Sequence, residues 1–166
     1  SLFHKCRALD VGGAAYIEDD GTKLFLGGVT STLQEAASTR VTISEATAES
    51  GGGLYLSQYA KAVVRNVAFT NNTAKGNWGG DGAAVFLIRA ELKMASSDMR
   101  DNKAESAGGA IYVDTRARFN SLERGGLESV ESGVHMQGNE APVGGAIMIG
   151  RYTSVDLEDF VFESNL

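Results

Sequence analysis

One short motif is repeated along the chain. In each copy an apolar residue stands three positions before a site that most often holds Asn, and in the first five copies Ala follows two positions later. A Gly-Gly or Gly-Ala pair comes next, followed by an apolar run such as AIYV or AIMI. The apolar and Asn-site residues are Phe3/Cys6, Ile43/Ala46, Phe69/Asn72, Met99/Asn102, Met136/Asn139 and Phe162/Asn165.

The copies are unevenly spaced, since their first residues lie 40, 26, 30, 37 and 26 residues apart. A fixed motif with a spacer of variable length is typical of a solenoid, in which equal positions stack and the connections take insertions. We therefore expect the runs after each small-residue pair to form one sheet of parallel strands in register. These runs are residues 14–17, 53–56, 84–87, 110–113 and 146–149.

The stretch from Gly53 to Phe69 contains three apolar runs, GLYL, AVV and NVAF, separated by brief polar breaks. In a parallel β-helix each strand pairs with the coil before and the coil after it, so parallel pairing requires no helices. The sequence thus predicts an all-β fold, a parallel β-helix of about five coils with three short strands per coil.

The pairing of Phe-x-x-Asn with a later Gly-Gly-Ala-Ile resembles the repeats of polymorphic outer-membrane proteins, best known from chlamydial surface adhesins. The resemblance covers nearly the whole chain and departs from the pattern at Cys6 and Ala46. It implies a right-handed parallel β-helix of the pectin-lyase type. The motif is clearest in FTNNTA (69–74), NKAESAGGAIYV (102–113), NEAPVGGAIMI (139–149) and FESN (162–165).

Length and composition narrow the classes of protein. The 166 residues suit a single β-helix segment over 1–166, which we expect to be part of a longer repeat protein because both ends fall inside the repeat pattern. A net charge of −6 disfavours nucleic acid as a partner. No apolar stretch is long enough to span a membrane. The single Cys6 allows neither an internal disulfide nor a Cys-based zinc site, and His4 and His135 occupy different motif positions. We expect no metal and no cofactor.

The Asn positions are expected to stack into a ladder. Asn side chains one above another can pass hydrogen bonds along the axis and satisfy the backbone of the turn. We interpret this ladder as structural, with a polar ligand-binding row as the alternative. Its members are Asn72, Asn102, Asn139 and Asn165. The apolar motif residues are expected in the core, with Phe69 lying between Ile43 and Met99.

The residues that alternate with the expected core positions form an outward row. An exposed aromatic row can bind a sugar or a partner protein. The alternatives are that these side chains pack only on one another, or that the two strand faces are reversed, because both faces are apolar. The row consists of Tyr16, Tyr55, Phe86, Tyr112 and Met148.

Catalysis would require a cluster of charged residues. A polysaccharide lyase on this fold needs grouped carboxylates for Ca²⁺ and a nearby Arg or Lys as base. Arg89, Arg116 and Arg151 could form a basic column, but the acidic groups Glu18–Asp20 and Asp156–Asp159 lie in different coils from these arginines. The sequence therefore predicts no enzyme.

The sequence predicts a non-catalytic segment of a surface or extracellular protein. It would serve as a rigid stalk or as an adhesion and recognition surface, with a protein, a glycan surface or neighbouring subunits as partners. One alternative is a carbohydrate-active enzyme of the pectin-lyase fold, either a polysaccharide lyase or a hydrolase. The other is an architectural subunit of a large assembly, and a fold alone does not choose among the three.

Overall fold

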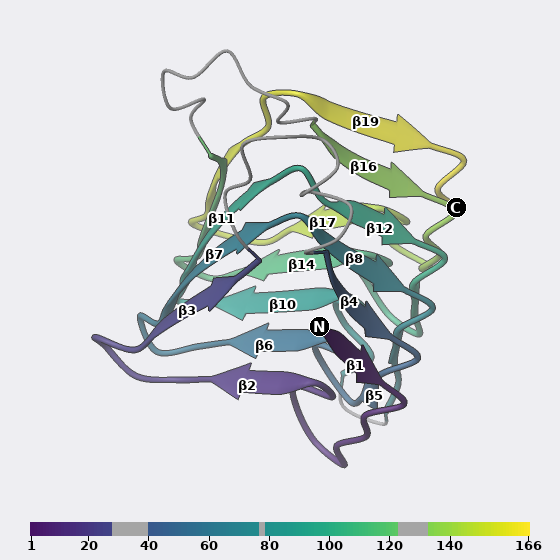
Figure 1. Cartoon of the computed structure of the whole chain (residues 1–166), viewed down its shortest axis with the longest axis horizontal. Coiled ribbons are helices and arrows are strands. Elements are labelled where there is room, and N and C mark those ends of the chain that lie inside the picture. The colour runs from purple at the N-terminus through teal and green to yellow at the C-terminus, as the bar shows by residue number, and fades with distance from the viewer. Residues whose placement is uncertain (28–39, 77–78, 123–132) are drawn as a thin grey trace.

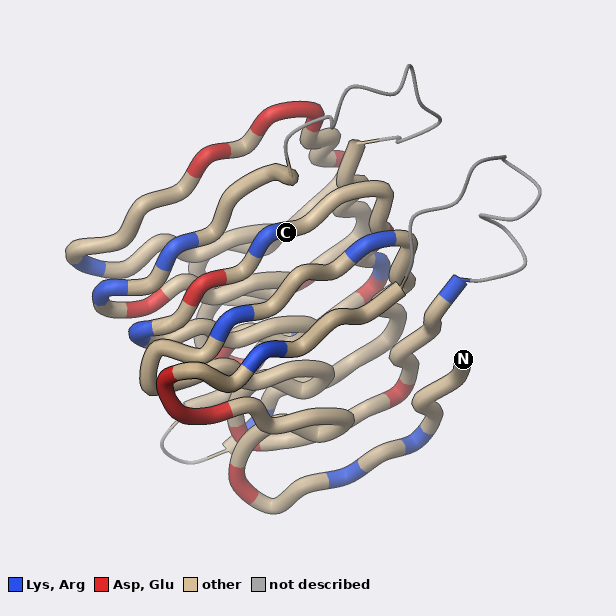
Figure 2. The backbone as a smooth tube through the Cα atoms, turned by 60° about the vertical axis from the view of Figure 1, so that its left-hand side comes forward, with Lys and Arg blue, Asp and Glu red and all other residues tan. Residues whose placement is uncertain are grey.

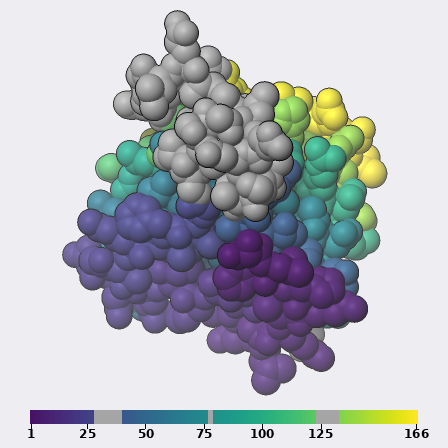
Figure 3. Space-filling model, viewed as in Figure 1, coloured from purple at the N-terminus to yellow at the C-terminus, as the bar shows by residue number. Residues whose placement is uncertain are grey.

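The computed structural model describes residues 1–27, 40–76, 79–122 and 133–166. Within these residues every regular element is a strand, and the strands form four sheets in which all pairings are parallel. Figure 1 shows successive strands stacked along one axis, and Figure 3 shows the closed surface of the same view. The chain is therefore all-β, as predicted.

Each sheet is named here by one of its strands. The β12 sheet contains β1 (Leu2–His4), β4 (Val41–Ser44), β8 (Val67–Thr70), β12 (Asp98–Arg100), β16 (Val134–Gln137) and β19 (Phe160–Glu163). The β10 sheet contains β2 (Ala15–Ile17), β6 (Leu54–Leu56), β10 (Val85–Ile88), β14 (Ile111–Asp114) and β17 (Ile147–Ile149). The β11 sheet contains β3 (Lys23–Leu26), β7 (Lys61–Arg65), β11 (Glu91–Ala95), β15 (Arg118–Ser121) and β18 (Ser154–Asp156). The β9 sheet contains β5 (Thr47–Ala48), β9 (Thr73–Ala74) and β13 (Lys103–Ala104).

The chain visits these sheets in a repeating order. From β4 to β16 it passes through the β12, β9, β10 and β11 sheets and then returns to the β12 sheet beside the strand it left. The passages from β1 to β4 and from β16 to β19 follow the same order without a named strand of the β9 sheet. Parallel sheets in this order are compatible with a parallel β-helix. The predicted sheet of five stacked runs is confirmed, because the β10 sheet pairs Tyr16 with Tyr55, Tyr55 with Phe86, Phe86 with Tyr112 and Tyr112 with Met148.

The expectation of three strands per repeat missed the β9 sheet. Its strands are two residues long and directly follow the Asn position, as in Asn72 before β9. Two residues are too few to show the alternation by which strands are recognised in a sequence. The recurring Ala after the Asn was the only available signal, and its side chain is buried at Ala48, Ala74 and Ala104.

The core lies between the sheets and is built from alternate strand residues. Phe69, Ile43 and Met99 are fully buried and adjacent in register, as predicted. The inward positions of the first and last strands are less covered: Ile149, expected inside, has 48% of its surface exposed on β17. It is uncovered because β17 is the outermost described strand of its sheet and has a neighbour only on the β14 side. Cys6, at the Asn site of the first repeat, is likewise only partly buried.

The glycine pair makes the tight corner before the β10 sheet. Gly108 has a φ of 65°, a left-handed conformation that favours glycine. A side chain on Gly109 would collide with the carbonyl oxygen of Gly145 and would lie 2.7 Å from the backbone nitrogen of Glu140. The pair thus supplies both the turn and the close backbone approach expected from the sequence.

Three sequence expectations fall outside the described residues. They are the loop or helical turn over 29–40, apart from Arg40, the insertion around Trp78, and the protruding loop that includes 123–132. No helix in the part of the chain that the structure describes is long and apolar enough to cross a membrane.

Candidate recognition surface

The four ladder asparagines form one hydrogen-bonded column. The Nδ2 atom of Asn72 donates to Oδ1 of Asn102 at 2.9 Å, and Asn102 donates in the same way to Asn139 at 2.9 Å. Asn139 donates to Oδ1 of Asn165 at 2.8 Å. The second proton on each Nδ2 goes to a backbone carbonyl of a preceding strand, for example from Asn102 to the oxygen of Phe69 at 3.1 Å.

The column is an internal support. Asn72, Asn102 and Asn139 have no exposed surface, so a ligand cannot reach them. Each Oδ1 also accepts a backbone N–H from the preceding repeat, and at the start of the column Ala46 donates its N–H to Asn72 at 3.0 Å. Ala46 therefore needs no amide of its own to keep its turn bonded to the next one.

The outward row of the β10 sheet is a stack of rings. The centroids of Tyr16 and Tyr55 are 5.4 Å apart, those of Tyr55 and Phe86 are 4.9 Å apart, and those of Phe86 and Tyr112 are 5.2 Å apart. The Tyr55 and Phe86 rings are nearly parallel, at 5°, whereas the other two pairs are tilted. Met148 continues the row in register after Tyr112. Parallel pairing thus brings together residues that lie far apart in the sequence.

The rings pack on one another and remain partly open to solvent. Phe86, in the middle, is only 7% exposed, while Tyr16, at one end, is 48% exposed. The faces of Tyr55 and Phe86 are covered by each other, so the row presents ring edges and hydroxyl groups. A sugar ring stacks on an open aromatic face, whereas a protein partner can pack against edges and bond to hydroxyls.

The tyrosine hydroxyls stay protonated well into the alkaline range. Burial raises the pKa of Tyr55 and of Tyr112 above the ordinary value of 10.0. The pKa of Tyr16 is also raised, first by its hydrogen bond with Glu18 and then by burial. At neutral pH the row therefore offers neutral hydroxyls that can both donate and accept hydrogen bonds.

The structure brings together some of the charged residues that the sequence seemed to keep apart. Arg89 and Arg116 line one hollow of about 340 Å³ and share it with Asp20. Asp156 and Glu158 line a separate hollow of about 350 Å³, and Arg151 lines neither. Asp20 belongs to a different repeat from these two arginines, as expected, and it shares their hollow because the corners before the β11 sheet stack on one another. Among the described residues no group of three or more His, Cys, Asp or Glu side chains could hold a metal ion.

The outer face of the β11 sheet was not singled out from the sequence. Lys23, Lys61, Lys93 and Arg118 lie there with Glu91. The alternation of charged and apolar residues in ELKM (91–94) was an available signal, because such a strand turns its charged side chains toward solvent.

Comparisons of the chain with protein-family models, curated proteins and solved structures found no match.

Proposed function

We propose that this chain is a right-handed parallel β-helix of about five coils, with repeats of the polymorphic outer-membrane protein type. The recurring order of the sheets, the asparagine column and the glycine corners support this assignment. The pectin-lyase-like handedness rests on the sequence resemblance and on the strong right-handed preference of parallel crossovers.

Its function is non-catalytic recognition at a cell surface or in the extracellular space, on a rigid stalk. The observation that carries this proposal is the in-register ring row Tyr16, Tyr55, Phe86 and Tyr112 on the outer face of the β10 sheet. Aromatic side chains are enriched where proteins bind one another. Rigid strands hold these rings in place, so little side-chain entropy is lost when a partner docks. A protein partner fits the covered ring faces best.

Bead adhesion tests the proposal. The purified chain is coupled to beads, and attachment is counted on cultured cells before and after protease treatment of the cell surface. We expect attachment to the untreated cells and its loss after protease treatment. The double variant Tyr16→Ser/Tyr112→Ser, checked for folding by circular dichroism, should attach poorly because the ends of the row become polar and small.

The matched control is Lys103→Ser/Glu140→Ser, which removes an exposed ion pair of 2.8 Å beside the β9 sheet. Its beads should attach like wild type. Equal attachment of wild type and the tyrosine variant would refute recognition by this row. In that case a buried position of the row against neighbouring subunits would be the better explanation, as expected of an architectural subunit.

The carbohydrate-active alternative draws support from one observation, the shared hollow of Asp20, Arg89 and Arg116. Its test is incubation with acidic polysaccharides with and without Ca²⁺, following unsaturated product and new reducing ends. We expect no turnover, because Glu91, the other carboxylate lining this hollow, lies 3.5 Å from Lys61 and 3.8 Å from Lys93. Turnover that disappears on chelation would establish the lyase instead.

A further inference from the structure

We propose that the outer face of the β11 sheet is a binding groove for a linear acidic polysaccharide, which it holds without cleaving. The site is separate from the tyrosine row, which lies on the β10 sheet. Three features carry the inference: a row of adjoining hollows along the axis, a surplus of unpaired cations on an acidic molecule, and apolar and acceptor groups set between the cations.

The outward side chains of this sheet stand in two columns. Strand register aligns Lys23 with Lys61, Lys61 with Glu91, and Glu91 with Arg118. The second column aligns Phe25, Val63, Lys93 and Asn120. Successive members of a column are separated by about 4.8 Å, the distance between paired strands. This repeat is comparable with the length of one sugar ring in an extended chain.

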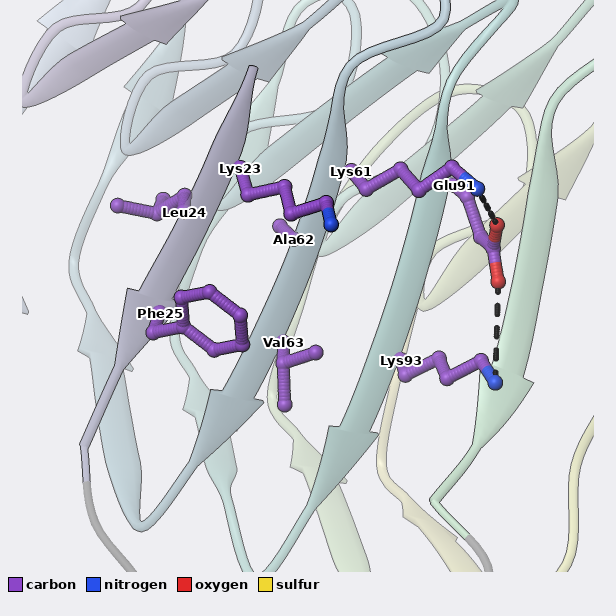
Figure 4. A pocket seen from close by; sticks show the side chains of 8 residues that line it. All are labelled: Lys23, Leu24, Phe25, Lys61, Ala62, Val63, Glu91 and Lys93. Atoms are coloured by element: carbon purple, nitrogen blue, oxygen red, sulfur yellow. Dashed lines mark ion pairs between the residues drawn. The ribbon is translucent and has the colours of Figure 1, made fainter. Parts of the chain in front are cut away.

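The columns form the floor of three adjoining hollows. One of about 280 Å³ lies over β3, β7 and β11 and is shown in Figure 4. It shares Lys61 and Glu91 with the hollow at the sheet's leading corner, and it shares Lys93 with the hollow over β15 and β18. Because neighbouring hollows share lining residues, they adjoin one another across the strands, and the groove proposed here follows that line.

The groove is basic although the chain carries a net charge of −6. Its basic residues outnumber its acidic ones between β3 and β15. Figure 2 shows Lys and Arg positions in blue and Asp and Glu positions in red along the strands of the side that it turns forward. The basic residues are Lys23, Lys61, Arg89, Lys93, Arg116 and Arg118, and the acidic residues are Asp20 and Glu91.

Most of these cations are available to a ligand. Glu91 pairs with Lys61 at 3.5 Å and with Lys93 at 3.8 Å, as the dashed lines in Figure 4 mark. In the described part of the chain, Lys23 and the three groove arginines make no ion pair. Guanidinium groups bind sulfate and carboxylate groups through paired hydrogen bonds, so an anionic ligand finds preformed donors.

The remaining groups select a glycan among polyanions. Phe25 is 70% exposed and Tyr59 is 56% exposed, and each lines the groove with an open ring on which a sugar can stack. Glu91 and Asp20 can accept hydrogen bonds from sugar hydroxyls. Single-stranded DNA has no free sugar hydroxyls along its strand that could donate to these two carboxylates. An acidic polysaccharide has hydroxyls between its charged groups, so it can bind the cations of the groove and also donate hydrogen bonds to the two carboxylates.

The charge also sets where the ligand ends. Asp156 and Glu158 line the hollow beyond Asn120, at the β18 end of the groove. Their carboxylates repel an anionic chain, so the ligand lies over β3, β7, β11 and β15. The four strands span about 14 Å at the usual strand separation, which accommodates only a short oligosaccharide.

Isothermal titration of the full chain tests the proposal, with heparin oligosaccharides as the sulfated probe, polygalacturonate oligosaccharides as the carboxylate probe and single-stranded DNA of equal charge as the comparison. We expect at least one polysaccharide to bind more tightly than the DNA, with an affinity that falls as salt rises. Preference between the two polysaccharides identifies the anionic group. No product should form during the titration.

Matched variants locate the site. Lys23→Gln/Arg118→Gln removes two unpaired groove cations and should raise the Kd for the preferred oligosaccharide about tenfold. Arg100→Gln/Lys103→Gln removes the same charge from the β12 and β9 sheets and should change the Kd less than about twofold. The tyrosine-row variant Tyr16→Ser/Tyr112→Ser should bind the oligosaccharide like wild type. The result for the groove can therefore be distinguished from the result for the tyrosine row.

Three results would overturn the groove: no binding of either polysaccharide, equal weakening by the groove and control variants, or DNA binding as tight as that of the polysaccharides. The last result would indicate a general polyanion or nucleic-acid surface.

Discussion

Replacing Asn102 with alanine would remove four hydrogen bonds from the middle of the asparagine column. The Asn102 side chain donates to the carbonyl oxygen of Phe69 at 3.1 Å and to Oδ1 of Asn139 at 2.9 Å. It accepts from the backbone N–H of Asn72 at 3.1 Å and from Nδ2 of Asn72 at 2.9 Å. All of this lies in the interior, since Asn102 has no exposed surface.

The free-energy cost of Asn102→Ala depends on which of the groups bonded to the Asn102 side chain keep another hydrogen-bond partner. Asn139 Oδ1 still accepts from the Asn102 backbone N–H, and Asn72 Nδ2 still donates to the oxygen of Ile43. The backbone N–H of Asn72 loses the acceptor it has in the structure, and an unsatisfied buried donor costs about 1–3 kcal/mol. With about 0.5–1.5 kcal/mol for each of the three other lost bonds, Asn102→Ala should lower the free energy of unfolding by about 2.5–7.5 kcal/mol.

Urea unfolding followed by circular dichroism measures the loss. Asn165→Ala is the matched control, because Asn165 donates to the oxygen of Met136 and accepts from Asn139 at a partly exposed position. Water can replace some of these bonds, so the control should lose only about 1–2 kcal/mol. A loss below about 1 kcal/mol for Asn102→Ala would refute the assignment of the column as a main support of the fold.

The variant Asn102→Asp adds a pH signature. A carboxylate would place acceptors against the oxygens of Asn139 and Phe69, so the folded state favours the protonated form and the pKa of the new carboxyl lies above its unfolded value of about 3.9. The variant should therefore be most stable below about pH 4 and lose stability as pH rises through the folded pKa. Destabilisation that does not depend on pH would contradict this reasoning.

Three further predictions concern the core, the corner and the ring row. Phe69→Ala should cost about 3–5 kcal/mol in urea unfolding, because the ring is fully buried, and a loss under about 1 kcal/mol would contradict its inward position. Gly109→Ala should be destabilising by about 1–3 kcal/mol or more, because the new methyl group collides with the carbonyl of Gly145, whereas a neutral effect would show that the backbones can separate. Alkaline spectrophotometric titration should find Tyr55 and Tyr112 ionising above 10.0, with their contribution to stability present below that pH and lost as pH rises through the folded pKa; their Phe variants should lack these ionisations.

The sequence by itself determined which segments form strands and which motif positions stack on one another. Runs such as AIYV predicted strands, but both of their faces are apolar, so the sequence left open which face was outward. The structure buries Ile111 and Val113 and leaves Tyr112 partly exposed. The fixed place of Asn102 in the motif predicted its neighbours Asn72 and Asn139, because equal positions stack whatever the length of the spacer. These features depend on residues within one short motif.

Only the tertiary structure decided which residues between the motif copies lie close together. The two-residue strands of the β9 sheet are too short to leave a pattern in the sequence. Asp20 joins Arg89 and Arg116 in one hollow, and Lys23, Lys61 and Arg118 share one face, although they lie in different repeats outside the motif. Their meeting depends on the register between strands and on the stacking of corners. That register is set by the stacking of buried residues and of corners in neighbouring repeats, which the sequence of one strand alone does not specify.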